Sequence, residues 1–273
     1  MAVSISLLGA SAAMALKVAK QPATVPSKTF GSALAQCTKG RTAVSGGFAA
    51  PGFNPNGGAT IGRLGFKHAG KGEIKTRGFN FGDAAGDLVS YAYCALHDHG
   101  FRIRSANTQI EPMAVGTAVA ECPLGTKAVG GGFDASRVSR QDGPGVLTLT
   151  SKRQGERRWK AVAINIPPDN GTGTAGTLTA YAYCEKAPFN LSTESKTVSP
   201  PTNNVKTFDV RCPHGGRAFS GGFDGHVTLD PQPSATVAVT SRRVYSGHAW
   251  RTTALSIFDS SSGTATAYAY CRG

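Results

Sequence analysis

Cys37-Thr-Lys-Gly-Arg-Thr-Ala-Val-Ser-Gly-Gly-Phe48 is the stretch that decides the fold, because the chain repeats it twice. The copies are Cys122-Pro-Leu-Gly-Thr-Lys-Ala-Val-Gly-Gly-Gly-Phe133 and Cys212-Pro-His-Gly-Gly-Arg-Ala-Phe-Ser-Gly-Gly-Phe223. All three follow the pattern C-x-x-G-x-x-A-[VF]-x-G-G-F, and they begin 85 and then 90 residues apart. Self-similarity at a nearly fixed spacing predicts three structural repeats.

A second block, Tyr-Ala-Tyr-Cys, closes each repeat at Cys94, Cys184 and Cys271. Each of the 6 cysteines therefore opens or closes a repeat, and this favours three internal disulfides. Among the possible pairings, the repeat symmetry favours Cys37–Cys94, Cys122–Cys184 and Cys212–Cys271. Disulfides need an oxidising compartment, so a secreted or extracellular location is expected.

The segments between the cysteines alternate with period two, as in Trp159–Ile166 and Trp250–Ile257, which is typical of β-strands. We predict an all-β fold of three tandem antiparallel repeats, with about four or five strands each. The repeats form either one β-prism-like body or three small β-sandwich units. Their expected bounds are 26–94, 108–184 and 203–271, with joints at 95–121 and 185–211.

The first 15 residues are apolar and end in Ala13-Met14-Ala15, which predicts a signal peptide at 1–15. No segment is apolar over a length that spans a bilayer. The formal charge is +13 and the pI is about 9.7, so the protein is basic and attracts anionic partners without needing a specific site.

The Cys-Pro-x-Gly opening, the Gly-Gly-Phe stretch, the Trp in mid-repeat and the Tyr-Ala-x-Cys exit resemble repeats of secreted bacterial proteins of unassigned function. The three-unit layout is also similar to the vitelline membrane outer layer protein family, which forms a threefold β-prism. Both resemblances imply an extracellular module, and neither supplies a catalytic site.

Aromatic residues recur at fixed places in the repeats and are candidates for ligand binding. If exposed, they could stack on sugar rings; if buried, each tyrosine pair would pack beside its disulfide with its hydroxyls bonded. Their recurrence in every repeat favours packing, and so does Ile74 at the tryptophan position of the first repeat. The candidates are Tyr91, Tyr93, Tyr181, Tyr183, Tyr268, Tyr270, Trp159 and Trp250.

Basic residues also recur. One set lies after the turn glycine of each repeat, at Arg41, Lys127 and Arg217. A threefold display of cations suits a repetitive anionic polymer, where weak contacts add through multivalency. Solvated strand faces are the ordinary alternative. The candidate ligand-binding residues are Lys152 and Arg153, the matching Arg242 and Arg243, and Arg63 as the counterpart in the first repeat.

The remaining motifs carry little chemistry. His97-Asp98-His99 has metal-ligand spacing but occurs once, so a surface turn is favoured, and no metal, cofactor or catalytic residue is predicted. The paired glycines match no nucleotide-binding loop and indicate a β-bulge or a close backbone approach.

We therefore predict a non-enzymatic extracellular binding or adhesive module for carbohydrate or an anionic envelope polymer. No specific nucleic-acid partner is expected. One alternative is a structural coat or matrix protein without a discrete ligand. Another is a hydrolase with a site between repeats, for which Asp83, Asp87, His97 and Asp98 are the candidates that do not recur.

Overall fold

The computed structural model describes residues 16–52, 54, 59–96, 101–136, 145–166, 174–186, 190–228, 234–257 and 263–273. The expected signal peptide, residues 1–15, and the cluster His97-Asp98-His99 lie outside the described residues.

The described residues form an all-β protein, as predicted. The first repeat contains β1 (Lys17–Val25), β2 (Phe30–Gln36), β3 (Thr42–Ala49), β4 (Ile61–Gly70), β5 (Glu73–Asn80) and β6 (Gly86–Ala95). The second contains β7 (Arg102–Ile110), β8 (Val115–Glu121), β9 (Thr126–Ala135), β10 (Val146–Gln154), β11 (Arg158–Asn165) and β12 (Gly176–Lys186). The third contains β13 (Ser192–Val198), β14 (Val205–Arg211), a 3₁₀ turn at Pro213–Gly215, β15 (Arg217–Gly225), the short β16 (Val227–Thr228), β17 (Ser234–Arg243), β18 (Ala249–Ile257) and β19 (Ala265–Arg272).

Each repeat thus has six principal strands and not four or five. The strands that were not expected are β1, which precedes the expected start of the first repeat at residue 26, and β7 and β13, which lie in the expected joints. No described residues form a helix long and apolar enough to cross a membrane.

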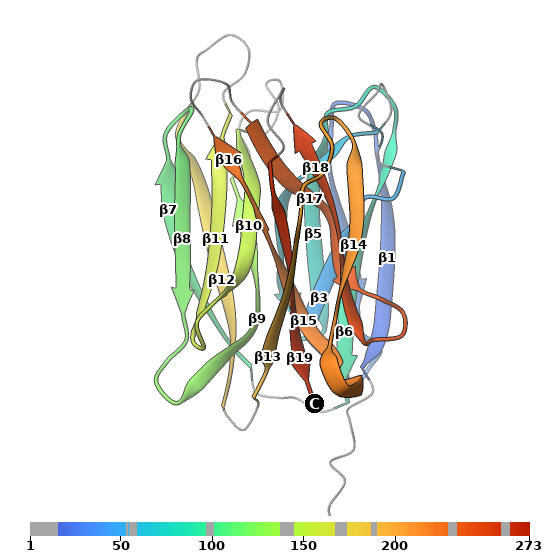
Figure 1. The fold of residues 1–273 in the computed structure, drawn as a ribbon, viewed down its shortest axis with the longest axis vertical. Coiled ribbons are helices and arrows are strands. Elements are labelled where there is room, and N and C mark those ends of the chain that lie inside the picture. The colour runs from blue at the N-terminus through green and yellow to red at the C-terminus, as the bar shows by residue number, and fades with distance from the viewer. Residues whose placement is uncertain are drawn as a thin grey trace, which may run out of the picture.

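The strands form three antiparallel sheets that run along the long axis of the molecule (Figure 1). Sheet A has the order β1-β6-β3-β17-β18-β14, with β16 beside β17. Sheet B has the order β2-β5-β4-β9-β12-β7, and sheet C has the order β13-β19-β15-β10-β11-β8.

Each sheet takes strands from two repeats, so the protein is a closed prism and not three separate β-sandwich units. The repeats meet at three seams, which we name by their strand pairs. The first seam is β4–β9, the second is β10–β15, and the third is β17–β3, which joins the last repeat to the first.

The two adjacent glycines of each repeat have different steric roles. A Cβ on Gly131 would lie 2.2 Å from the Trp159 ring, so the first glycine makes room for the mid-repeat side chain. A Cβ on Gly132 would lie 2.1 Å from the carbonyl oxygen of Phe66, so the second glycine lets the neighbouring repeat approach across the seam. The predicted close backbone approach is confirmed.

The phenylalanine that follows each glycine pair packs where the three sheets face one another. The rings of Phe48, Phe133 and Phe223 meet edge to face, with centroids 5.7 to 6.4 Å apart, and all three are buried. Edge-to-face packing is a favoured arrangement for aromatic rings. The repeated motif therefore builds the centre of the prism.

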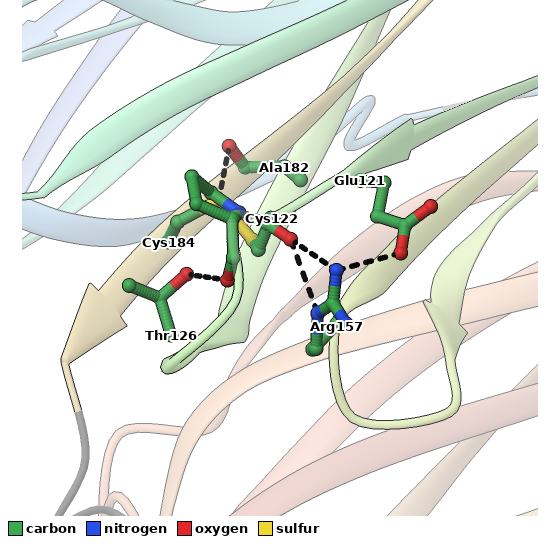
Figure 2. The surroundings of a disulfide bond; sticks show 7 residues. Glu121, Cys122, Thr126, Arg157, Ala182 and Cys184 are labelled. Carbon is green, nitrogen blue, oxygen red and sulfur yellow. Dashed lines mark hydrogen bonds and ion pairs between the residues drawn. A yellow bond between two sulfur atoms is a disulfide. The ribbon is translucent and has the colours of Figure 1, made fainter.

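The three predicted disulfides are present, with Cα–Cα distances of 5.7, 5.5 and 5.6 Å in chain order. All lie at the end of the prism that carries the C-terminus, which we call the cysteine end. Figure 2 shows the second bond, Cys122–Cys184. Beside it, the Arg157 guanidinium donates to the carbonyl oxygen of Cys122 at 3.0 and 3.2 Å and to Glu121 at 2.8 Å.

Candidate anion-binding pocket

The second tyrosine of each pair is buried at a seam. The hydroxyls of Tyr93, Tyr183 and Tyr270 accept hydrogen bonds from the backbone N–H groups of the preceding repeat. The Tyr93 hydroxyl is 2.6 Å from the nitrogen of Arg243, and the Tyr270 hydroxyl is 2.7 Å from that of Arg153. These three tyrosines hold adjacent repeats together and present no free face to a sugar.

The first tyrosine of each pair is half-buried under a cation. Lys67 lies over Tyr181, Lys152 over Tyr268 and Arg242 over Tyr91, with 5.2 to 5.5 Å between the charged group and the ring centroid. Tyr91, Tyr181 and Tyr268 are therefore the tyrosine candidates that remain in reach of a ligand.

Both tryptophans are core residues. Trp159 and Trp250 are 1% exposed, and their indole N–H groups donate to the hydroxyls of Ser151 at 2.9 Å and Ser241 at 2.8 Å. A fully buried ring cannot stack on a sugar, so the structure places these candidates in the packing role.

The counterpart of the basic pairs in the first repeat is Lys67 and His68, and not Arg63. Ser151, Ser241 and Phe66 each pair across a seam with a motif phenylalanine, so these three positions are equivalent. The two residues that follow each of them in the chain are therefore equivalent as well. Arg63 lies four residues before Lys67 and is equivalent to Thr148 and Ala238, because the same register shift follows each of these three residues.

A pocket of about 110 Å³ opens at the cysteine end of the third seam. We call it the arginine pocket, because three arginines approach it over an apolar floor. Its lining is Leu16, His214, Gly215, Gly216, Arg217, Ala218, Phe219, Arg243, Arg272 and Gly273.

At the equivalent place on the second seam, the two matching cations have hydrogen-bond and ion-pair partners. Arg153, the equivalent of Arg243, donates to the Leu191 carbonyl at 3.1 Å and to the Thr193 hydroxyl at 2.7 Å. Lys127, the equivalent of Arg217, lies 3.3 Å from Glu156 and 3.1 Å from the Asn190 side-chain oxygen. Both cations have bonded partners.

At the third seam two of these partners, Thr193 and Glu156, have been replaced. Val18 occupies the position of Thr193, since Lys17 and Ser192 pair with Cys94 and Cys271 in the same register. Gly247 occupies the position of Glu156, because each accepts the equivalent backbone hydrogen bond. Neither replacement offers a side-chain acceptor to Arg217 or Arg243.

Arg243 is only 7% exposed, and its Nε is buried with no hydrogen-bond partner among the described residues. Its Nη2 donates to the Leu16 carbonyl at 3.2 Å, and its guanidinium lies over Tyr93. Burial and the positive charge of Arg217 both lower the pKa of Arg243 below its ordinary value. No carboxylate of a described residue pairs with Arg217. An anion in this pocket would supply the missing negative charge beside both arginines.

The rim of the pocket holds a strained residue. His214 adopts φ 50° and ψ 34°, a left-handed conformation that is unfavourable for a non-glycine residue. The equivalent residues Lys39 and Leu124 do not have a positive φ. Strain of this kind costs about 1 kcal/mol or more and concentrates at functional sites.

The candidates for a hydrolytic site are not brought together in the described structure. Asp83 pairs with Lys28 at 3.0 Å, and Asp87 accepts a hydrogen bond from Thr24 at 3.1 Å. His97 and Asp98 lie outside the described residues. The described part of the chain contains no group of three or more His, Cys, Asp or Glu residues able to hold a metal ion.

Sequence reasoning did not place Leu16, His214 and Arg272 at a site, and it noted Arg217 only as one of three repeated cations. The decisive feature is the loss of partners at Val18 and Gly247. This loss becomes visible only when the repeats are aligned through their sheet registers. No protein-family model matches the chain, and no curated protein matches it.

Proposed function

We propose that the protein is a non-enzymatic extracellular binding module that captures an anionic group in the arginine pocket. The group would be a sulfate, a phosphate or a carboxylate carried by a ligand outside the cell. The observation that carries the proposal is the buried guanidinium of Arg243 beside Arg217 at the pocket, where neither arginine pairs with a carboxylate of a described residue.

The energetics favour an anion over a neutral ligand. A buried charge without a counterion is costly, and hydrogen bonds to charged groups are roughly twice as strong as neutral ones. The shape of the guanidinium suits the planar or tetrahedral oxygens of carboxylate, sulfate and phosphate. The formal charge of +13 supports the proposal by favouring the approach of anions.

The proposed location rests on the disulfides. Three disulfide bonds in one chain are typical of oxidising compartments. The resemblance to secreted repeat proteins points the same way.

The test is a calorimetric titration of the full chain with sodium sulfate, sodium phosphate and sodium galacturonate at low ionic strength. Arg217→Gln should weaken the binding of the preferred anion about tenfold or more, because it removes a charge-assisted hydrogen bond.

Lys127→Gln is the matched control. It removes a cation from the same motif position of the second repeat, where Glu156 and Asn190 already hold the lysine. Equal weakening by the two variants, with all binding lost at high salt, would mean that net charge alone attracts the anion. That result would refute the pocket.

A further inference from the structure

The outer faces of the three sheets carry one repeated cluster, in which a tyrosine lies under a cation at the seam. On sheet B the cation is Lys67, and its Nζ lies 2.6 Å from Asp134 and 3.3 Å from the Tyr181 hydroxyl. Although partial burial acts to lower it, the ion pair with Asp134 raises the pKa of Lys67 above its ordinary value. On this face the cation has an ion-pair partner, which it shares with Arg77.

Sheet C carries the same arrangement at the second seam. Lys152 pairs with Asp224 and lies 3.3 Å from the Tyr268 hydroxyl. Asp224 also accepts a hydrogen bond from Thr150 at 2.6 Å, and these two residues are opposite each other across the seam. The acid directly follows the motif phenylalanine in both repeats.

Sheet A differs at this one position. Ala49 follows Phe48 and lies opposite Thr240 across the third seam, where the second seam has Asp224 opposite Thr150. Arg242 lies over the half-buried Tyr91, and no carboxylate of a described residue pairs with it. The nearby Asp209 is held by Arg251 through two bonds of 2.8 and 2.9 Å.

The unneutralised cluster continues into the arginine pocket. Arg242 and Arg243 lie over Tyr91 and Tyr93, which are two residues apart on β6 and hence about 7 Å apart along the strand. The Arg242 Nη1 donates at 3.4 Å to the backbone carbonyl of Arg243, a residue that lines the pocket.

On the other side of Tyr91, the exposed Lys20 is its partner in the sheet register. Lys20, Tyr91 and Arg242 therefore form a basic and aromatic strip on the outer face of sheet A, which we call the sheet A strip. The strip ends at Arg243 and Arg217.

We propose that the sheet A strip and the arginine pocket together bind an acidic polysaccharide. This inference rests on the proposed function, because one acidic group of the chain occupies the pocket. The next acidic group lies at Arg242, with a sugar ring beside the half-buried Tyr91. A polymer gains from both sites, since the second contact forms at high effective concentration once the first is made. The oxidising compartment favours a polysaccharide over a nucleic acid.

The test compares galacturonate with a defined oligogalacturonate on the full chain. Ala49→Asp places an acid where the other two faces have one, opposite Thr240 and within reach of Arg242. It should weaken oligomer binding tenfold or more and leave monomer binding within twofold. Arg242→Gln provides the same comparison if the aspartate alters folding. Lys152→Gln, at the same place on sheet C, should change neither affinity.

The outcomes separate the two proposals. Unchanged oligomer affinity in both Ala49→Asp and Arg242→Gln would overturn the polysaccharide strip, even if Arg217→Gln abolishes monomer binding. Absence of any monomer binding that depends on Arg217 would instead overturn the pocket. Tighter binding of a single-stranded DNA of matched charge than of the oligogalacturonate would overturn the choice of polysaccharide.

Discussion

The mid-repeat position shows how single residues adjust to one another across strands. In the second and third repeats a tryptophan there donates to a serine, Ser151 or Ser241. In the first repeat, Ile74 takes the tryptophan position and Phe66 takes the serine position. A smaller side chain on one strand is thus matched by a larger one on its neighbour, as close packing of a core requires.

Some of these residue roles follow from sequence and others do not. The disulfide pairs and the packing role of Trp159 follow from repetition, because a residue needed in every repeat serves the architecture. The pocket residues do not follow, because their property is a missing partner. That absence depends on Val18, which belongs to the first repeat, and on Gly247, which lies far from Arg217 along the chain.

Glu185 gives a prediction for pH dependence. It is 6% exposed at the cysteine end, and burial raises its pKa from an ordinary 4.5 to about 7, although the charge of Arg272 opposes this. A raised carboxyl pKa means that the native state binds the proton more tightly than the unfolded state. Its stabilising contribution is therefore complete below about pH 4.5 and is lost as the pH rises through about 7.

The variant Glu185→Gln should lack this dependence. Urea unfolding across this pH range should show the wild type losing stability relative to the variant as the pH rises, by at most about 3 kcal/mol. Parallel pH profiles for the two proteins would show that Glu185 does not titrate in this way.

At the level of elements, the seams are short but sterically demanding. Each seam contains two residue pairs in register, such as Gly65–Asp134 and Phe66–Phe133 at the first seam. Local alternation predicts a strand but does not say which repeat its neighbour comes from. The sequence therefore left a prism and three separate units both open, and β7 and β13 within the expected joints were missed for lack of a strong pattern.

A substitution at the seam glycine should destabilise the whole molecule. Gly132→Ala would place its Cβ 2.1 Å from the carbonyl oxygen of Phe66, a backbone atom that cannot move without shifting β4. We expect a loss of about 3 kcal/mol or more in the free energy of unfolding, measured as a lower urea midpoint.

Gly130→Ala, on the same strand, is the control. Its nearest atom would be Tyr183 Cδ2 at 3.4 Å, an ordinary contact, so the change should cost little. If both variants unfold at the same urea concentration, close approach across the seam does not limit the fold.

At the scale of the whole molecule, three equivalent seams close a ring, and each sheet joins half of one repeat to half of the next. On two seams the outer cation pairs with an aspartate across the seam, and on the third no carboxylate of a described residue pairs with Arg242. A symmetric scaffold can thus carry one asymmetric site through a few replacements. The repeated residues build the prism, and the residues that break the repeat lie at the proposed binding site.

We propose that the arginine pocket at the third seam is the primary anion site of the protein. The most direct measurement follows the Nε–H signals of the arginine side chains by NMR while the full chain is titrated with sodium sulfate. We predict that the Arg243 signal shifts and saturates, whereas that of Arg153, its bonded equivalent at the second seam, does not. An unmoved Arg243 signal, or matching shifts at both residues without saturation, would contradict the account.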